Sequence, residues 1–146
     1  MKGGVDTNIL VYAHRQDDPN HPPSLQNVTA LAEGASPWAI PWPCIHEFLA
    51  VVTQPAVMRR PSPYDRAIAD IEAILSSPTL MLIGETDGHW SILRELLATS
   101  RPIGRAVHDA KIAAICLQHG VTEFWTAYHG FSRFAGLRVI NPLAAV

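Results

Sequence analysis

The chain has 146 residues, of which 48% are hydrophobic, and a formal net charge of -2 at pH 7. This length is enough to bury one good core and too short for two, so we expect a single globular domain over residues 1–146. The near-neutral charge excludes a protein that coats nucleic acid through bulk positive charge, because such proteins are strongly basic. Any contact with nucleic acid must therefore be local.

The two cysteines, Cys44 and Cys116, lie in apolar surroundings and form no CxxC pair. This pattern argues against a zinc site and against a disulfide framework, and it predicts two reduced core residues. The amino terminus has no apolar signal-type stretch behind a basic start, and no apolar run approaches the roughly 20 residues that span a bilayer. We therefore expect a soluble, cytoplasmic protein without membrane contact.

The first half of the chain offers two candidate strands and one clear helix. The first strand, residues 1–5, is weak, because it combines one β-former with two glycines. A second strand is expected at residues 38–40. Apolar residues then recur at threes and fours over residues 63–75, which predicts a helix, with Ser62 as its cap.

The second half of the chain continues the alternation of strands and helices. A strand is expected at residues 80–83, and a helix follows Thr86. Residues 107–119 form a helical pattern that is apolar on almost every face, which predicts a buried helix ending before Gly120. Two more strands are expected, at residues 124–126 and 137–140. Strands that alternate with helices predict an α/β fold, a parallel sheet covered on both sides.

Three acidic residues stand where the edge of such a sheet should lie. Asp6 directly follows the first strand, Glu47 lies one turn into the helix after residues 38–40, and Asp109 lies in the first turn of the buried helix. Ligands of parallel α/β sheets collect outside the carboxyl ends of the strands. We therefore expect Asp6, Glu47 and Asp109 to converge on one pocket.

Three neighbouring carboxylates need an opposing charge. Each pair about 4 Å apart repels by about 4 kcal/mol at an effective dielectric near 20, so three ionised acids carry roughly 12 kcal/mol. An oxygen-only ligand set is the type that binds Mg²⁺ or Mn²⁺, and such an ion leaves the acids charged. Two alternatives stay open: one acid is protonated, or Asp6 and Asp109 serve as helix-start charges and Glu47 as a surface acid.

The segments "VDTNILVYA", "PWPCIHEFLAVVTQP" and "VHDAKIAAICLQHG", followed by "FWTA" and "FSRFAGLRVINPL", resemble the PIN-domain ribonucleases, and most closely the VapC-type toxins of bacterial toxin–antitoxin pairs. The resemblance covers nearly the whole chain, in order and at the usual spacing. It implies a PIN-like three-layer fold, a central parallel sheet flanked by helices, and Mg²⁺- or Mn²⁺-dependent cleavage of RNA.

The resemblance also implies roles for individual residues and partners. The first metal-binding Asp of the family falls on Asp6, its middle acid on Glu47 and its helix-start Asp on Asp109, while the Asn that supports the first loop falls on Asn8. The expected partners are an RNA substrate, a small cognate antitoxin that blocks the acidic pocket, and a second copy of the chain in a homodimer.

One segment departs from the family pattern. Where relatives commonly read Thr-x-Asp-x-Asp-Phe, this chain reads "TAYHGF", so Tyr128 and Gly130 replace both acids. The fourth carboxylate is missing, which leaves open whether two metals bind and whether activity is complete. His129 is a candidate for a weak metal or phosphate contact.

Arg105 and Lys111 flank the start of the helix that carries Asp109, and both are candidates for contacts with RNA phosphates.

The main alternative is a catalytically silent PIN-like domain that binds RNA or a protein without cleaving it. A phosphoryl-transfer enzyme of another α/β type is disfavoured, since the sequence has neither an Asp-x-Asp after the first strand nor a phosphate-binding glycine loop.

Overall fold

A central sheet of parallel strands organises the computed structural model, which describes residues 3–144. Its strands are β1 (Gly3–Val5), β2 (Trp38–Pro41), β3 (Leu80–Ile83), β4 (Glu123–Trp125) and β5 (Arg138–Ile140). They lie in the order β3-β2-β1-β4-β5, and every neighbouring pair is parallel. The strands predicted at residues 38–40, 80–83, 124–126 and 137–140 are confirmed to within one residue at each end.

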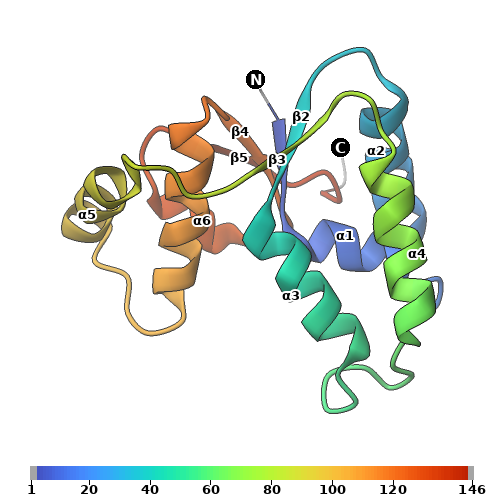
Figure 1. The fold of residues 1–146 in the computed structure, drawn as a ribbon. Coiled ribbons are helices and arrows are strands. Elements are labelled where there is room, and N and C mark those ends of the chain that lie inside the picture. The colour runs from blue at the N-terminus through green and yellow to red at the C-terminus, as the bar shows by residue number, and fades with distance from the viewer. Residues whose placement is uncertain (1–2, 145–146) are drawn as a thin grey trace.

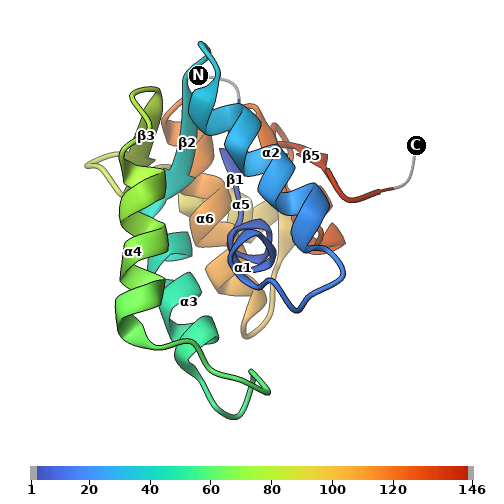
Figure 2. The same ribbon diagram turned by 90° about the vertical axis from the view of Figure 1, so that its right-hand side faces the viewer.

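Helices cover both faces of this sheet. They are α1 (Thr7–His14), α2 (His21–Glu33), α3 (Trp42–Thr53), α4 (Tyr64–Leu75), α5 (His89–Ser100) and α6 (Ala106–Gln118), with a short 3-10 helix, η1 (His129–Arg133). Figure 1 shows α5 and α6 on one side of the sheet and α1, α2 and α4 on the other, while α3 extends from the end of β2. The view in Figure 2 agrees with this arrangement. The predicted α/β fold is confirmed.

The glycines of β1 explain why this weak-looking strand can occupy the middle of the sheet. A Cβ added at Gly4 would lie 3.1 Å from Val121 Cγ1 and 3.3 Å from the Phe124 ring, closer than is comfortable for packed carbon atoms. The absence of a side chain at Gly4 therefore lets Val121 and Phe124, both fully buried, pack directly against the strand.

Helix α6 is the central helix of the core, as its apolar pattern predicts. Ala113, Ala114, Ile115 and Cys116 are all fully buried. Cys44 is also buried, and both cysteines are free thiols, which confirms the prediction of two reduced core residues. The helix ends before Gly120, whose φ of 73° is the left-handed conformation that glycine adopts without strain.

Helix α4 differs from its prediction in two respects. Its N-cap position is Pro63 and no side chain caps it, so the assignment of Ser62 as a capping residue is wrong. Its apolar pattern also faces the core only in part, because Ala67 and Ile71 are buried whereas Ile68 is 44% exposed. The helix therefore presents an apolar stripe outward as well as inward.

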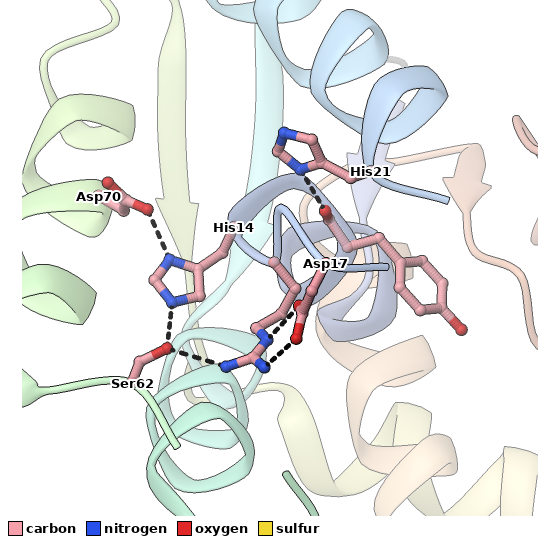
Figure 3. Close-up of polar contacts among 7 residues, drawn as sticks. His14, Asp17, His21, Ser62 and Asp70 are labelled. Atoms are coloured by element: carbon pink, nitrogen blue, oxygen red, sulfur yellow. Dashed lines mark hydrogen bonds and ion pairs between the residues drawn. The ribbon is translucent and has the colours of Figure 1, made fainter. Parts of the chain in front are cut away.

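Ser62 instead joins a polar cluster around His14, the last residue of α1. His14 Nδ1 lies 2.5 Å from Asp70 Oδ2 on α4, and His14 Nε2 lies 2.7 Å from Ser62 Oγ (Figure 3). The buried imidazole also packs edge-on against Phe48 of α3, with ring centroids 5.2 Å apart. This cluster links α1, α3, α4 and the segment between α3 and α4.

None of the helices within residues 3–144 is both long enough and apolar enough to cross a membrane.

Candidate functional site

A large cleft lies at the carboxyl ends of the strands. The chain returns from β3 on one side of β1 to β4 on the other, so β1 and β4 flank the point where strand order reverses, the usual ligand position in open α/β sheets. The cleft has a volume of about 1520 Å³, and its lining includes Asp6, Glu47 and Asp109. The structure thus places all three predicted site residues on one cleft.

Asp6 is held in place by several hydrogen bonds at the end of β1. Its Oδ1 accepts a hydrogen bond of 2.7 Å from the Thr7 backbone N–H, which makes Asp6 the N-cap of α1. Its Oδ2 accepts one of 2.8 Å from the Thr126 hydroxyl, which follows β4. The Cys44 thiol lies 3.6 Å from Oδ1 as a further, weak donor. Asp6 therefore caps α1, and the same hydrogen bonds hold its side chain in one orientation at the edge of the cleft.

The electrostatics of Asp6 go beyond what a cap requires. The pKa of Asp6 is raised from the ordinary 3.8 to about 6, mainly by burial and to a lesser extent by the charge of Glu47, against the hydrogen bonds from Thr126 and Thr7. Exposed N-cap carboxylates are normally stabilised in the charged form. Asp6 therefore carries a charge that the surrounding protein does not balance.

Thr126 and Asn8 brace this carboxylate from the far side. The Thr126 hydroxyl donates to Asp6 and accepts hydrogen bonds of 3.0 Å from Asn8 Nδ2 and from the Tyr128 backbone N–H. Asn8 Oδ1 in turn accepts one of 3.2 Å from the Ala127 backbone N–H. Asn8 thus ties the start of α1 to the segment after β4, and Thr126 fixes the orientation of Asp6. The sequence reading singled out Asn8 and missed Thr126.

Glu47 projects from the middle of α3 and is exposed to the cleft. Its Oε2 accepts a hydrogen bond of 3.2 Å from the Thr7 hydroxyl. Thr7 therefore contacts two of the acids, because its backbone N–H also donates to Asp6. Thr7 therefore connects the start of α1 to the middle of α3 through its hydrogen bond to Glu47.

Asp109 stands in the first turn of α6 and is half-buried. Burial raises the pKa of Asp109, and Glu47 raises it further, while Arg133, His108 and Arg105 act in the opposite direction. Glu47 thus raises the pKa of both aspartates, so its carboxylate repels each of them. Arg105 and Lys111, the predicted phosphate contacts, also line the cleft.

The ligand chemistry of the three acids fits a hard divalent cation, since every donor is a carboxylate oxygen. An ion between them would also favour the charged form of Asp6 and Asp109, whose pKa values burial raises. Within residues 3–144, no group of three or more His, Cys, Asp or Glu side chains is already arranged around a common ion position. The acids line one cleft without forming a closed cage, and their role as metal ligands stays a prediction.

Tyr128 and Gly130, which replace the family's remaining acids, are coupled to each other. Tyr128 lines the cleft and is 47% exposed. A Cβ added at Gly130 would overlap with the Tyr128 ring, so the ring occupies the space of a side chain at position 130. The ring also packs edge-on against Phe131, with centroids 6.1 Å apart. His129 is exposed and does not line the cleft.

Aromatic residues on α3 are a feature of the cleft that the sequence reading missed. Trp42, the first residue of α3, is 42% exposed and lines the cleft together with His46. Their rings are stacked, with centroids 6.0 Å apart and an interplanar angle of 29°. The available signal was the i, i+4 spacing of Trp42 and His46 in the helix that carries Glu47.

The chain is similar to known proteins along most of its length. The PIN domain family matches residues 5–137. The chain is 33% identical to ribonuclease VapC43 of Mycobacterium tuberculosis over 139 residues, which cover 95% of this chain and 94% of that protein.

Two solved structures share the fold. One is VapBC2 from Rickettsia felis bound to a promoter DNA fragment, with a TM-score of 0.69 and 22% identity over 97% of this chain and 98% of that one. The other is a toxin–antitoxin complex from Klebsiella pneumoniae, with a TM-score of 0.63 and 19% identity over 96% and 97%. Together with the match over residues 5–137, they confirm the PIN-like architecture, and the chain belongs to the PIN-domain family and, within it, to the VapC ribonucleases.

Proposed function

We propose that this chain is a metal-dependent endoribonuclease and the toxin of a type II toxin–antitoxin pair. The observation that carries the proposal is the convergence of Asp6, Glu47 and Asp109 on one cleft at the switch point of the sheet. A ribonuclease relative that matches over 95% of the chain supports the reaction class. The cytoplasm, where cellular RNA is made and used, is the proposed place of action.

Asp6 and Asp109 are the proposed holders of Mg²⁺ or Mn²⁺, with Glu47 as the third ligand. Such an ion would lower the pKa of a bound water and neutralise charge on the phosphodiester. The Glu47 side chain is exposed to the cleft and accepts a hydrogen bond from the hydroxyl of Thr7, whose backbone N–H donates to Asp6.

The chain's own residues then divide the remaining tasks. Glu47, held by the Thr7 hydroxyl, orients the attacking water, whose oxygen forms the new bond to phosphorus and gives up a proton, while the bond to the leaving ribose oxygen breaks and that oxygen takes up a proton. Arg105 and Lys111 contact neighbouring phosphates from the start of α6. Thr126 and Asn8 keep Asp6 pointed at the reacting group throughout.

The proposed protein partners are an antitoxin and a second copy of the chain. The Klebsiella pneumoniae structure, described as a toxin–antitoxin complex, supports an antitoxin. The outward apolar stripe of α4, formed by Tyr64, Ile68 and Leu75, supports a homodimer. Sedimentation of the purified chain should give a dimer, and Ile68→Glu should shift it to a monomer.

A second candidate function is an RNA-binding domain that does not cleave. Tyr128 and Gly130 favour it, because they remove the fourth acid and fill its place with an aromatic ring. The acids that remain on the cleft disfavour it.

Incubation of purified protein with RNA in Mn²⁺ or in EDTA tests the two functions. We expect cleavage only with Mn²⁺, loss of cleavage in Glu47→Gln, and normal cleavage in the matched control Glu95→Gln on α5, whose side chain is exposed and lies outside the cleft. RNA that is bound but left intact in Mn²⁺ would establish the silent domain instead.

A further inference from the structure

Two aromatic groups stand on opposite sides of Asp6 in the cleft. Trp42 directly follows β2, and Tyr128 lies three residues after the end of β4. In the sheet, β2 and β4 are the two neighbours of β1, whose end carries Asp6. The carboxyl ends of parallel strands share one edge, so the order along the cleft is an aromatic residue, the acids, and a second aromatic residue.

Both aromatic groups are available to a ligand. Trp42 is 42% exposed and Tyr128 is 47% exposed, although large aromatic side chains normally lose most of their accessible surface in a folded domain. His46 lies stacked beside Trp42 and is exposed as well, so a further flat ring can extend the stack. Tyr128 is steadied by Phe131 and by the space that Gly130 leaves open.

The charged groups of the cleft indicate the chemical class of its ligand. Arg105 and Lys111 supply cations for phosphates, while the acids supply the cation-binding and reacting centre. Aromatic faces beside cationic groups are the combination by which proteins hold unpaired nucleotides. A purely apolar partner would leave these charges without counterparts.

We propose that Trp42, backed by His46, and Tyr128 are base-stacking contacts that hold one unpaired nucleobase on each side of the scissile phosphate. This inference rests on the proposed ribonuclease function and adds how the substrate is positioned. The reacting strand must be unpaired at both nucleotides, because a base in a duplex cannot leave its own stack without a cost. Tyr128 then contributes to substrate binding at the position where the family's acid is absent.

Two measurements test the proposal, and both start from the whole chain. The first is binding of a fluorescein-labelled, unstructured 12-nucleotide RNA of mixed sequence, followed by anisotropy in EDTA so that no cleavage occurs. Trp42→Ala should weaken binding by about tenfold, within the range of a lost base stack. Trp42→Phe should retain most of the affinity. The matched control is Trp90→Ala, because Trp90 on α5 is 63% exposed and lies outside the cleft.

The second measurement couples protein and RNA. After the cleavage site has been mapped in Mn²⁺, the base on either side of it is removed to leave an abasic nucleotide. In the wild-type protein each abasic RNA should raise KM by about tenfold with little change in kcat, since stacking acts alike in the ground and transition states. Trp42→Ala should be insensitive to one of the two abasic positions and Tyr128→Ala to the other.

The outcomes separate this inference from the proposed function. If the wild-type protein cleaves RNA but Trp42→Ala binds and cleaves like Trp90→Ala, the stacking role is overturned while the ribonuclease stands. If both abasic RNAs are cleaved as well as the intact RNA, the positioning role is overturned too. A wild-type protein that neither binds nor cleaves RNA would overturn the proposed function and this inference together.

Discussion

Helix α1 carries a buried polar side chain at each end, and the two ends are balanced in opposite ways. At its carboxyl end, His14 meets groups of complementary character, the Asp70 carboxylate and the Ser62 hydroxyl. At its amino end, Asp6 faces Glu47, a group of the same charge, and burial raises its pKa to about 6. One end satisfies its polar atoms within the chain, whereas the other leaves a charge to be balanced from outside.

The contrast matters because the carboxyl end carries the same residue types as a hydrolase triad. Ser62, His14 and Asp70 form hydrogen bonds in the order found around catalytic serines. None of the three lines the large cleft, and Arg15 Nη1 is a further donor to the Ser62 hydroxyl at 3.4 Å. We therefore assign this end to stability and the amino end to chemistry.

The largest expected effect comes from removing charge at the chemical end. Asp109→Asn keeps the volume of the side chain but removes a carboxylate, so Mn²⁺-dependent RNA cleavage should fall by about 100-fold or more. The free energy of unfolding in EDTA should stay the same or rise, because a like charge beside Glu47 is lost. Urea unfolding checks this, and a clearly less stable variant would favour the helix-start role of Asp109.

The next largest effect comes from the carboxyl end of α1, where a substitution should lower stability and leave cleavage unchanged. His14→Ala leaves a cavity beside Phe48 and removes the partner of Asp70 and Ser62, so the free energy of unfolding should fall by about 3 kcal/mol. Cleavage per folded molecule should persist below the melting transition. Asp87→Asn, on an exposed side chain before α5 and away from the cluster, is the control and should melt like the wild type. Loss of activity in folded His14→Ala would break the assignment.

A pH series sharpens the comparison at Asp6. Its pKa rises from 3.8 to about 6 on folding, so the folded state holds the extra proton between these values. Stability should therefore fall as pH rises through this window, by about 3 kcal/mol in total. Asp6→Asn should lose most of this decline in EDTA and keep only the part that the raised pKa of Asp109 contributes, and saturating Mn²⁺ should reduce the decline in the wild type. Equal pH slopes for the two proteins would mean that Asp6 titrates normally.

The smallest effect concerns position 128. Tyr128→Asp restores a carboxylate on the cleft and should strengthen Mn²⁺ binding and raise the cleavage rate of substrates that do not depend on stacking. Without metal the variant should lose only about 1 kcal/mol, because the side chain is half-exposed and water screens the added charge. Calorimetric Mn²⁺ titration measures the gain, and an unchanged affinity would place position 128 outside the metal site.

Much of this site could be predicted from the sequence, because it depends on local rules. Asp6, Glu47 and Asp109 follow a strand end or a helix start, and parallel strands bring such positions to one edge. The role of Thr126 could not be found in this way, since its hydroxyl reaches Asp6 across 120 positions and carries no spacing signal.

The stabilising end was missed for the same reason. His14 lies 56 positions from Asp70 and 48 from Ser62, and the serine before a proline-rich helix start looked like a cap. Only the packing of α1 against α3 and α4 brings the three together. Long-range polar contacts between single residues leave no periodic pattern, whereas apolar burial does.

The overlap between the Tyr128 ring and any side chain at position 130 couples these two positions of the loop. Gly130→Asp alone would require the far end of the half-exposed ring to shift, whereas Tyr128→Asp opens space and requires no such shift. The two positions are therefore epistatic, because the effect of an acid at position 130 depends on whether the tyrosine is present.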